Sequence, residues 1–163
     1  MTPLPEAKAF GEDERSVLLG YLDYHRAVLA RKLDGVSDAD GARAAIPSSR
    51  LTLLGLVRHM TDVERWWFRR VFAGEDVLGL FDDEAEWDVP VGTSVTATLA
   101  AFRAEVTVVD GILAAAPMED LTRGGDPPHH SLRRTVVHLI EEYARHCGHA
   151  DLLREAIDGS TGD

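Results

Sequence analysis

One apolar repeat near the C-terminal end of the sequence constrains the fold more than any other feature. The positions that form it are spaced alternately four and three residues apart: Leu132, Val136, Leu139, Tyr143, His146, Ala150, Leu153 and Ile157. This spacing follows the turn of an α-helix, so the positions form a single stripe along one helix face. The repeat therefore predicts a helix over residues 132–157 that packs its stripe against other helices.

Side chains of the metal-binding kind gather beside this stripe. His146 is a stripe position, and Glu142 precedes it by four residues, which places the two side chains over one another. His149 and His138 lie further round the same flank. A single His on an apolar helix face is commonly an ordinary core residue, but a carboxylate beside the core needs a partner. A divalent cation or an arginine would serve as that partner, and a cation would need a third ligand from elsewhere.

Three further segments have apolar residues at helical spacing: residues 12–34, 52–73 and 94–116. Thr52 is placed to cap the second of them, and Thr93 or Ser94 the third. Since no convincing alternating strand pattern occurs, the sequence predicts an all-α fold, a four-helix bundle with long connections. We expect the acidic connection over residues 74–92 to be more mobile than the helices and to lie near one end of the bundle.

Length and charge limit the classes of function. A chain of 163 residues predicts a single domain over residues 1–163, with residues 1–11 as a loose N-terminal arm. The formal net charge of -11 has the wrong sign for binding nucleic acid. No apolar run is long enough to cross a membrane, and the first residues lack a signal peptide. With Cys147 as its one cysteine, which we interpret as a small buried hydrophobe, the chain is expected to be cytoplasmic.

His59 is the strongest third ligand for a cation at Glu142 and His146. It is the one His of the second predicted helix, and it lies about one turn from stripe residues on both sides. Two His and one Glu leave a tetrahedral ion with an open position, which is typical of catalytic sites. Zinc suits these donors best, and nickel, iron or manganese are also compatible with them.

Two segments carry a resemblance to a known family. LTLLGLVRHMTDVERWWF (residues 51–68) and HLIEEYARHCGHADLLREAIDG (residues 138–159) resemble the DinB/YfiT-like superfamily of metal-dependent enzymes. Within it, the chain is most similar to an actinobacterial branch related to mycothiol-dependent transferases. The resemblance implies a four-helix bundle with one metal ligand on the second helix and two on the last, here His59, Glu142 and His146. Many relatives have His at the position of Glu142, but the mycothiol-dependent isomerases resemble this chain in having Glu.

The resemblance also implies a function. A transferase or isomerase of this kind would activate a low-molecular-weight thiol, mycothiol in particular, for attack on an electrophilic substrate. His149 stands where relatives commonly have Gln, and its role is open among a fourth ligand, a partner that orients a ligand, a catalytic acid and base, and an ordinary surface His. The alternative is a bundle that binds a metal or ligand without turnover, as a stress-response sensor or a homodimeric scaffold.

Other side chains of the second helix have two interpretations each. Asp62 would orient the ring of His59, or it would simply be solvated. The aromatic residues Trp66, Trp67 and Phe68 would line a substrate pocket or pack in the core. The nearby arginines would bind a carboxylate of the thiol or form surface charge: Arg58, Arg65, Arg69 and Arg70.

Overall fold

The structure is a computed structural model that describes residues 13–82 and 84–161. The predicted N-terminal arm, residues 1–11, lies outside the described residues. Regular structure in the described part is helical, apart from an isolated bridge between Leu121 and Ser131. The elements are α1 (Glu14–Arg31), α2 (Asp38–Gly41), α3 (Leu53–Glu64), the π-helical segment η2 (Arg65–Phe72), α4 (Val95–Ala115) and α5 (Leu132–Asp158).

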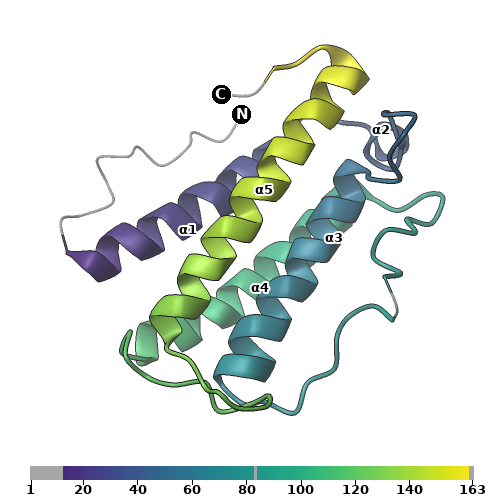
Figure 1. Cartoon of the computed structure of the whole chain (residues 1–163). Helices are drawn as coiled ribbons and strands as arrows, with labels where there is room; N and C mark the ends of the chain where they lie inside the picture. The colour runs from purple at the N-terminus through teal and green to yellow at the C-terminus, as the bar shows by residue number, and fades with distance from the viewer. Residues whose placement is uncertain (1–12, 83, 162–163) are drawn as a thin grey trace.

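The long helices form the predicted bundle. α1 packs against α5, α3 packs against α4, and α3 also lies beside α5, so the pair α3 and α5 joins the two halves (Figure 1). The predicted helix ends agree with the observed ones to within a few residues. The short helix α2 and the loops around it fill the first long connection. In the described part of the chain, no helix is both long enough and apolar enough to cross a membrane.

The apolar stripe of α5 faces the interior as the sequence predicts. Seven of its eight positions are buried, and Ile157 at the end of the helix is partly buried. Ser131 caps the helix by accepting a hydrogen bond from the backbone N–H of Arg134. Gly159 ends it with φ of 78°, a left-handed conformation that glycine adopts without a steric penalty. The stripe therefore fixes which face of α5 meets α1 and α3.

The second predicted helix changes its hydrogen-bond register part-way along. It begins at Thr52, whose hydroxyl accepts from Gly55 N at 2.9 Å, and is α-helical to Glu64. From Arg65 it is π-helical, and Ala73 N donates to Phe68 O, five residues back, at 2.9 Å. Apolar spacing alone does not distinguish the two registers, because apolar residues continue through Trp67 on the packed side.

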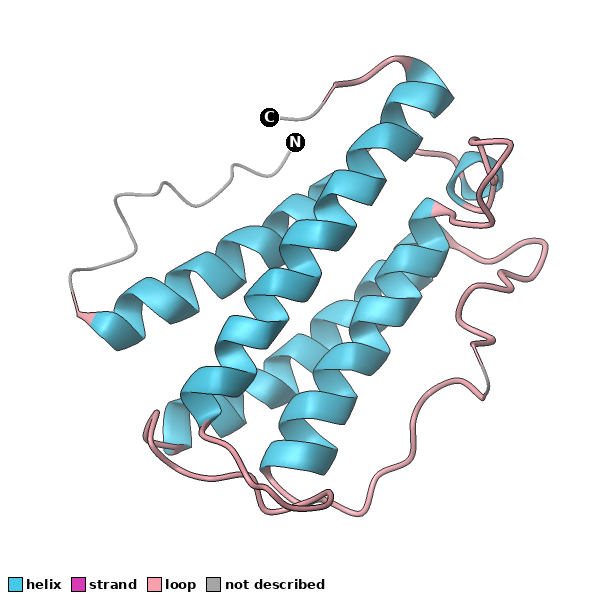
Figure 2. Ribbon diagram, viewed as in Figure 1, coloured by secondary structure: helices cyan, strands magenta, loops and turns pink. Residues whose placement is uncertain are grey.

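The acidic connection after η2 runs beside α3 on its outer side before it enters α4 (Figure 2). It lies against the helix through specific contacts. Arg65 Nε donates to Leu78 O at 2.8 Å, and Arg58 Nε donates to Glu86 O at 3.0 Å. Trp87 is partly buried against the core. The connection therefore lies along α3 and comes close to His59, and not only near one end of the bundle.

Candidate metal centre

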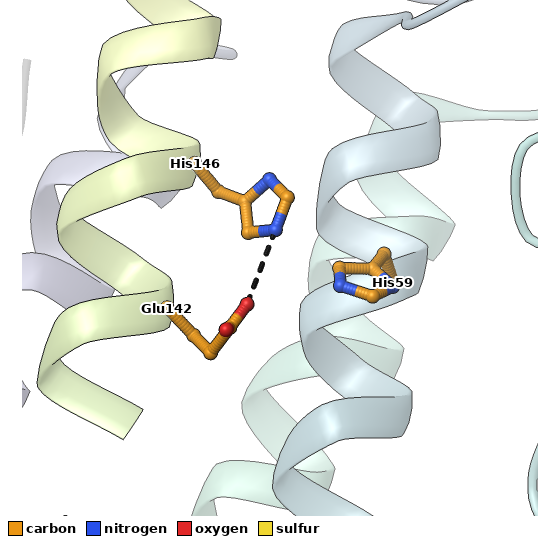
Figure 3. A group of neighbouring side chains, drawn as sticks. All are labelled: His59, Glu142 and His146. Carbon is orange, nitrogen blue, oxygen red and sulfur yellow. Dashed lines mark ion pairs between the residues drawn. The ribbon is translucent and has the colours of Figure 1, made fainter. Parts of the chain in front are cut away.

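His59, Glu142 and His146 come together between α3 and α5 (Figure 3). One ligand atom from each of the three lies within 4.8 Å of the other two. His146 Nε2 is 3.4 Å from Glu142 Oε2, and the ring centroids of His59 and His146 are 4.8 Å apart. The three residues predicted from spacing and resemblance are thus neighbours in space, contributed by the two facing helices.

The surroundings keep the His146 ring neutral. Burial first, and then the neighbouring rings of His59 and His149, lower its pKa from 6.5 to about 4, against the smaller raising effect of the Glu142 carboxylate. A neutral imidazole has a lone pair on one ring nitrogen, which is the form that binds a metal ion. At neutral pH His146 is therefore in the protonation state that a ligand requires.

The two carboxylate oxygens of Glu142 have different partners. Oε1 accepts a hydrogen bond from Arg145 Nη1 at 3.1 Å, whereas Oε2 faces His146. The Glu142 side chain is 16% exposed and the Arg145 side chain 52% exposed. Arg145 thus binds the outer oxygen from the surface, and the inner oxygen remains directed at the histidines.

His149 contacts His146 and is not a member of the converging group. Its Nδ1 lies 3.3 Å from His146 Nδ1, so one ring donates and the other accepts. If His146 binds a cation through Nε2, its Nδ1 carries the proton and donates to His149. Among the four roles that the sequence leaves open, this geometry favours orientation of His146 over ligation.

A second group, His138, Glu141 and Glu142, also has ligand atoms within 4.8 Å of one another. It is less suited to a cation. The side chains of His138 and Glu141 are 34% and 58% exposed, and both carboxylates bind Arg145. Exposed ligands compete with water, and Arg145 already neutralises Glu141, the carboxylate that this group does not share with the first.

Glu86 and Trp87 are contacts of His59 that the sequence analysis did not identify. Glu86 Oε1 lies 3.2 Å from His59 Nδ1, and the Trp87 ring stacks on the His59 ring with centroids 4.7 Å apart. Asp62, for which the sequence left an orienting role or plain solvation open, accepts from Leu80 N through Oδ1 at 2.7 Å, whereas the partner of His59 Nδ1 is Glu86. Only proximity in the fold reveals Glu86, since the acidic connection offers many carboxylates and no spacing rule selects one.

The comparisons with known proteins identify the family. Residues 17–159 match a family model described as mycothiol-S-transferase. The chain belongs to this family. A crystal structure described as the conserved protein of locus from Enterococcus faecalis is similar in fold, with a TM-score of 0.63 and 16% identity, over 92% of this chain and 100% of that one. No curated protein matches the chain.

One cavity of this mycothiol S-transferase family member borders His59, and a second lies at Trp87, the residue that stacks on His59. One, of about 140 Å³, is bordered by His59 and Glu86 and by the side chains of Trp66 and Trp67. The other, of about 570 Å³, is bordered by Trp87 and by Arg50, which lies in the connection between α2 and α3. Trp66 and Trp67 thus border a cavity, whereas Phe68 is buried in the core.

The four arginines of the second helix are engaged within the protein. Arg58 and Arg70 donate to backbone carbonyls of the acidic connection. Arg65 and Arg69 both contact the carboxylate of Glu105 on α4 at 3.2 Å. These contacts account for the arginines without a bound carboxylate, so the structure favours an internal role for them.

Proposed function

We propose that this protein is a metal-dependent mycothiol S-transferase whose divalent cation is held by His59, Glu142 and His146. The observation that carries the proposal is the convergence of two imidazoles and one carboxylate from facing helices in a chain of this family. These side chains fit a cation. His146 is neutral, the inner oxygen of Glu142 faces it, and the Nδ1 atoms of both histidines have other partners, which leaves each Nε2 for the cation.

The choice of metal follows from the donors. Two nitrogens and one oxygen suit zinc, and nickel, iron or manganese are alternatives within the same proposal. When bound, the cation supplies a Lewis acid that lowers the pKa of a thiol at its open position. The fold itself depends on the buried stripes and not on the ion, so the protein is expected to fold in the metal-free state.

In the transfer, the thiol sulfur forms a bond to an electrophilic carbon of the substrate. The leaving group departs with the electron pair of the bond that breaks, and the thiol proton passes to a base. We assign that base to His149. While its Nδ1 accepts from His146, its Nε2 already carries the ring proton, so Nδ1 takes the thiol proton when that hydrogen bond opens, and the residue is only partly buried.

The two cavities support separate binding places for the electrophile and for the thiol. A volume of about 140 Å³ beside Trp66 and Trp67 suits a small, flat electrophile. The cavity of about 570 Å³ at Trp87 and Arg50 is large enough for the body of the thiol. A homodimer and a cytoplasmic location remain predictions from the sequence.

The test combines metal content with transfer. Untagged protein is analysed for bound elements, loaded with zinc or nickel, and assayed for transfer of mycothiol to monochlorobimane or a chlorodinitrobenzene. We expect about one cation per chain, and His59→Ala should lose most of both properties while His129→Ala, an exposed His outside the group, retains them. Equal metal binding and transfer by His59→Ala would overturn the proposal. Stoichiometric metal without any transfer would instead favour the non-catalytic binding module.

A further inference from the structure

The acidic connection contributes a residue to the candidate metal centre. We propose that Glu86 is a positioning residue that fixes the tautomer and the orientation of His59. The inference rests on the proposed function, because it concerns how His59 is prepared to bind a cation. It adds a residue 27 positions away in sequence, in a segment with no regular secondary structure.

The contact between the two side chains determines which nitrogen carries the proton. Glu86 Oε1 lies 3.2 Å from His59 Nδ1, and an ionised carboxylate only accepts hydrogen bonds. His59 therefore donates from Nδ1–H, and the lone pair of a neutral ring is on Nε2. The Glu86 side chain is 13% exposed and the His59 side chain 21% exposed, so water competes weakly for this hydrogen bond. The charge of Glu86 also makes the imidazole a stronger donor of electrons to a cation.

The backbone of Glu86 is held by the residue that precedes His59. Arg58 donates from Nε to Glu86 O at 3.0 Å and from Nη2 to Ala85 O at 2.9 Å. The segment also forms its own turn, because Trp87 N donates to Glu84 O at 3.1 Å. The carboxylate of Glu86 is thus aimed at His59 by contacts that do not involve the carboxylate itself.

Trp87 restrains the other degree of freedom of the His59 ring. The two rings are stacked, with an angle of 27° between their planes. Stacking limits rotation of the imidazole out of its plane, and the hydrogen bond from Nδ1 limits rotation within the plane. Since the contacts of Arg58 and Trp87 do not involve the Glu86 carboxylate, we expect its removal to leave the segment in place and to change His59.

The test compares Glu86→Gln and Glu86→Ala with Asp88→Asn. Asp88 is a carboxylate of the same segment that contacts Arg50 at 3.5 Å and is a matched control. Zinc affinity is measured by competition with a chromophoric chelator. We expect Glu86→Ala to bind zinc about 10- to 100-fold more weakly, Glu86→Gln to lie between it and the parent protein, and Asp88→Asn to be within about twofold of the parent.

A second measurement reports on His59 without metal. In ¹⁵N-labelled, metal-free protein at one pH, long-range ¹H–¹⁵N spectra distinguish the two imidazole tautomers. His59 should be in the Nδ1–H form in the parent and in Asp88→Asn, and in a mixture of forms in both Glu86 variants. If Glu86 had only a structural role, its replacement would not change the tautomer of His59 while leaving the amide spectrum of the helices unchanged.

The outcomes separate the two proposals. If the parent binds zinc, His59→Ala does not, and both Glu86 variants retain parental affinity and an unchanged His59 tautomer, the positioning role is overturned and the proposed function stands. If the parent itself binds no cation, the proposed function fails, and the tautomer in metal-free protein still decides whether Glu86 controls His59. Should Glu86→Ala not fold, Glu86→Gln provides both measurements.

Discussion

Tyr143 donates a hydrogen bond of 2.7 Å to Glu64 Oε1, with both side chains fully buried where α3 meets α5. Glu64 also accepts two hydrogen bonds of 2.7 Å from the Arg26 guanidinium on α1. Burial and then the Glu64 carboxylate raise the pKa of Tyr143 well above 10.0, so its hydroxyl remains a donor. Because Tyr143 directly follows Glu142 in the sequence, this network holds α5 in the register that places Glu142 opposite His59.

Replacement of Glu64 should strongly destabilise the fold. Glu64→Ala leaves the guanidinium of Arg26, whose side chain is 5% exposed, without its buried partner. We expect a loss of about 3 to 5 kcal/mol in the free energy of unfolding, measured by urea denaturation. Glu141→Ala, on the surface of α5, is the control and should change the free energy by less than about 1 kcal/mol. A Glu64→Ala variant as stable as this control would contradict the assigned role of the network.

A close backbone approach at the end of η2 requires glycine. Gly124 N donates to Val71 O at 2.9 Å, and a Cβ atom at position 124 would overlap the carbonyl oxygen of Arg70. Gly124→Ala should therefore lower the melting temperature in a thermal scan by several degrees, equivalent to about 1 to 3 kcal/mol. Gly111→Ala is the matched control, because a Cβ there meets nothing within 4 Å and alanine favours the helix α4. A melting temperature of Gly124→Ala equal to that of the parent would refute this account.

The sequence predicted features that depend on local spacing and on burial. The stripe of α5, the caps Thr52 and Ser131, and the bundle all follow from periodicity and short-range hydrogen bonding. The prediction that His59 lies near Glu142 rested on its position one turn from the apolar positions of its helix and on the family resemblance. No local rule pairs residues on different helices.

Other features that depend on tertiary contacts were not predicted. The change to a π-helix at Arg65 leaves the apolar pattern unaltered. The contact between Glu86 and His59 depends on the path of an irregular connection, which Arg58 sets through backbone carbonyls. Asp62 was considered as the partner of His59 because it is one turn away on the same helix, but its carboxylate instead accepts from the backbone of that connection.

Arg58 should control how firmly the acidic connection is held. Arg58→Ala removes the donors to Ala85 O and Glu86 O and should speed hydrogen exchange of the Trp87 amide about tenfold or more, because the turn around it loses its support. Arg50→Ala is the control, since its hydrogen bonds to the same connection are longer, at 3.4 and 3.5 Å. Exchange at Trp87 that is equal in the two variants would show that other contacts hold the connection.

The buried thiol of Cys147 should lower the free energy of unfolding at high pH. The side chain is 6% exposed with Sγ 3.6 Å from His25 O, and burial, followed by the charge of Asp151, raises its pKa from 9.0 to about 12. Above pH 9 the unfolded thiol loses its proton while the native thiol keeps it, so unfolding is favoured increasingly until the native thiol ionises near pH 12. Below pH 9 both states keep the proton, and the thiol contributes no pH dependence.

Cys147→Ala isolates this contribution, because the raised pKa of Tyr143 affects the parent and the variant alike. The parent should lose about 2 kcal/mol more than Cys147→Ala between pH 8 and pH 10.5 in urea denaturation. The comparison uses the change with pH and not the absolute free energy, since alanine also alters the packing around the sulfur. Thiol labelling with iodoacetamide at pH 8 should likewise be slow in the native parent and fast in urea, because the thiolate is the reactive form. Parallel pH dependence of the two proteins, together with rapid native labelling, would show that the thiol is neither buried nor raised in pKa.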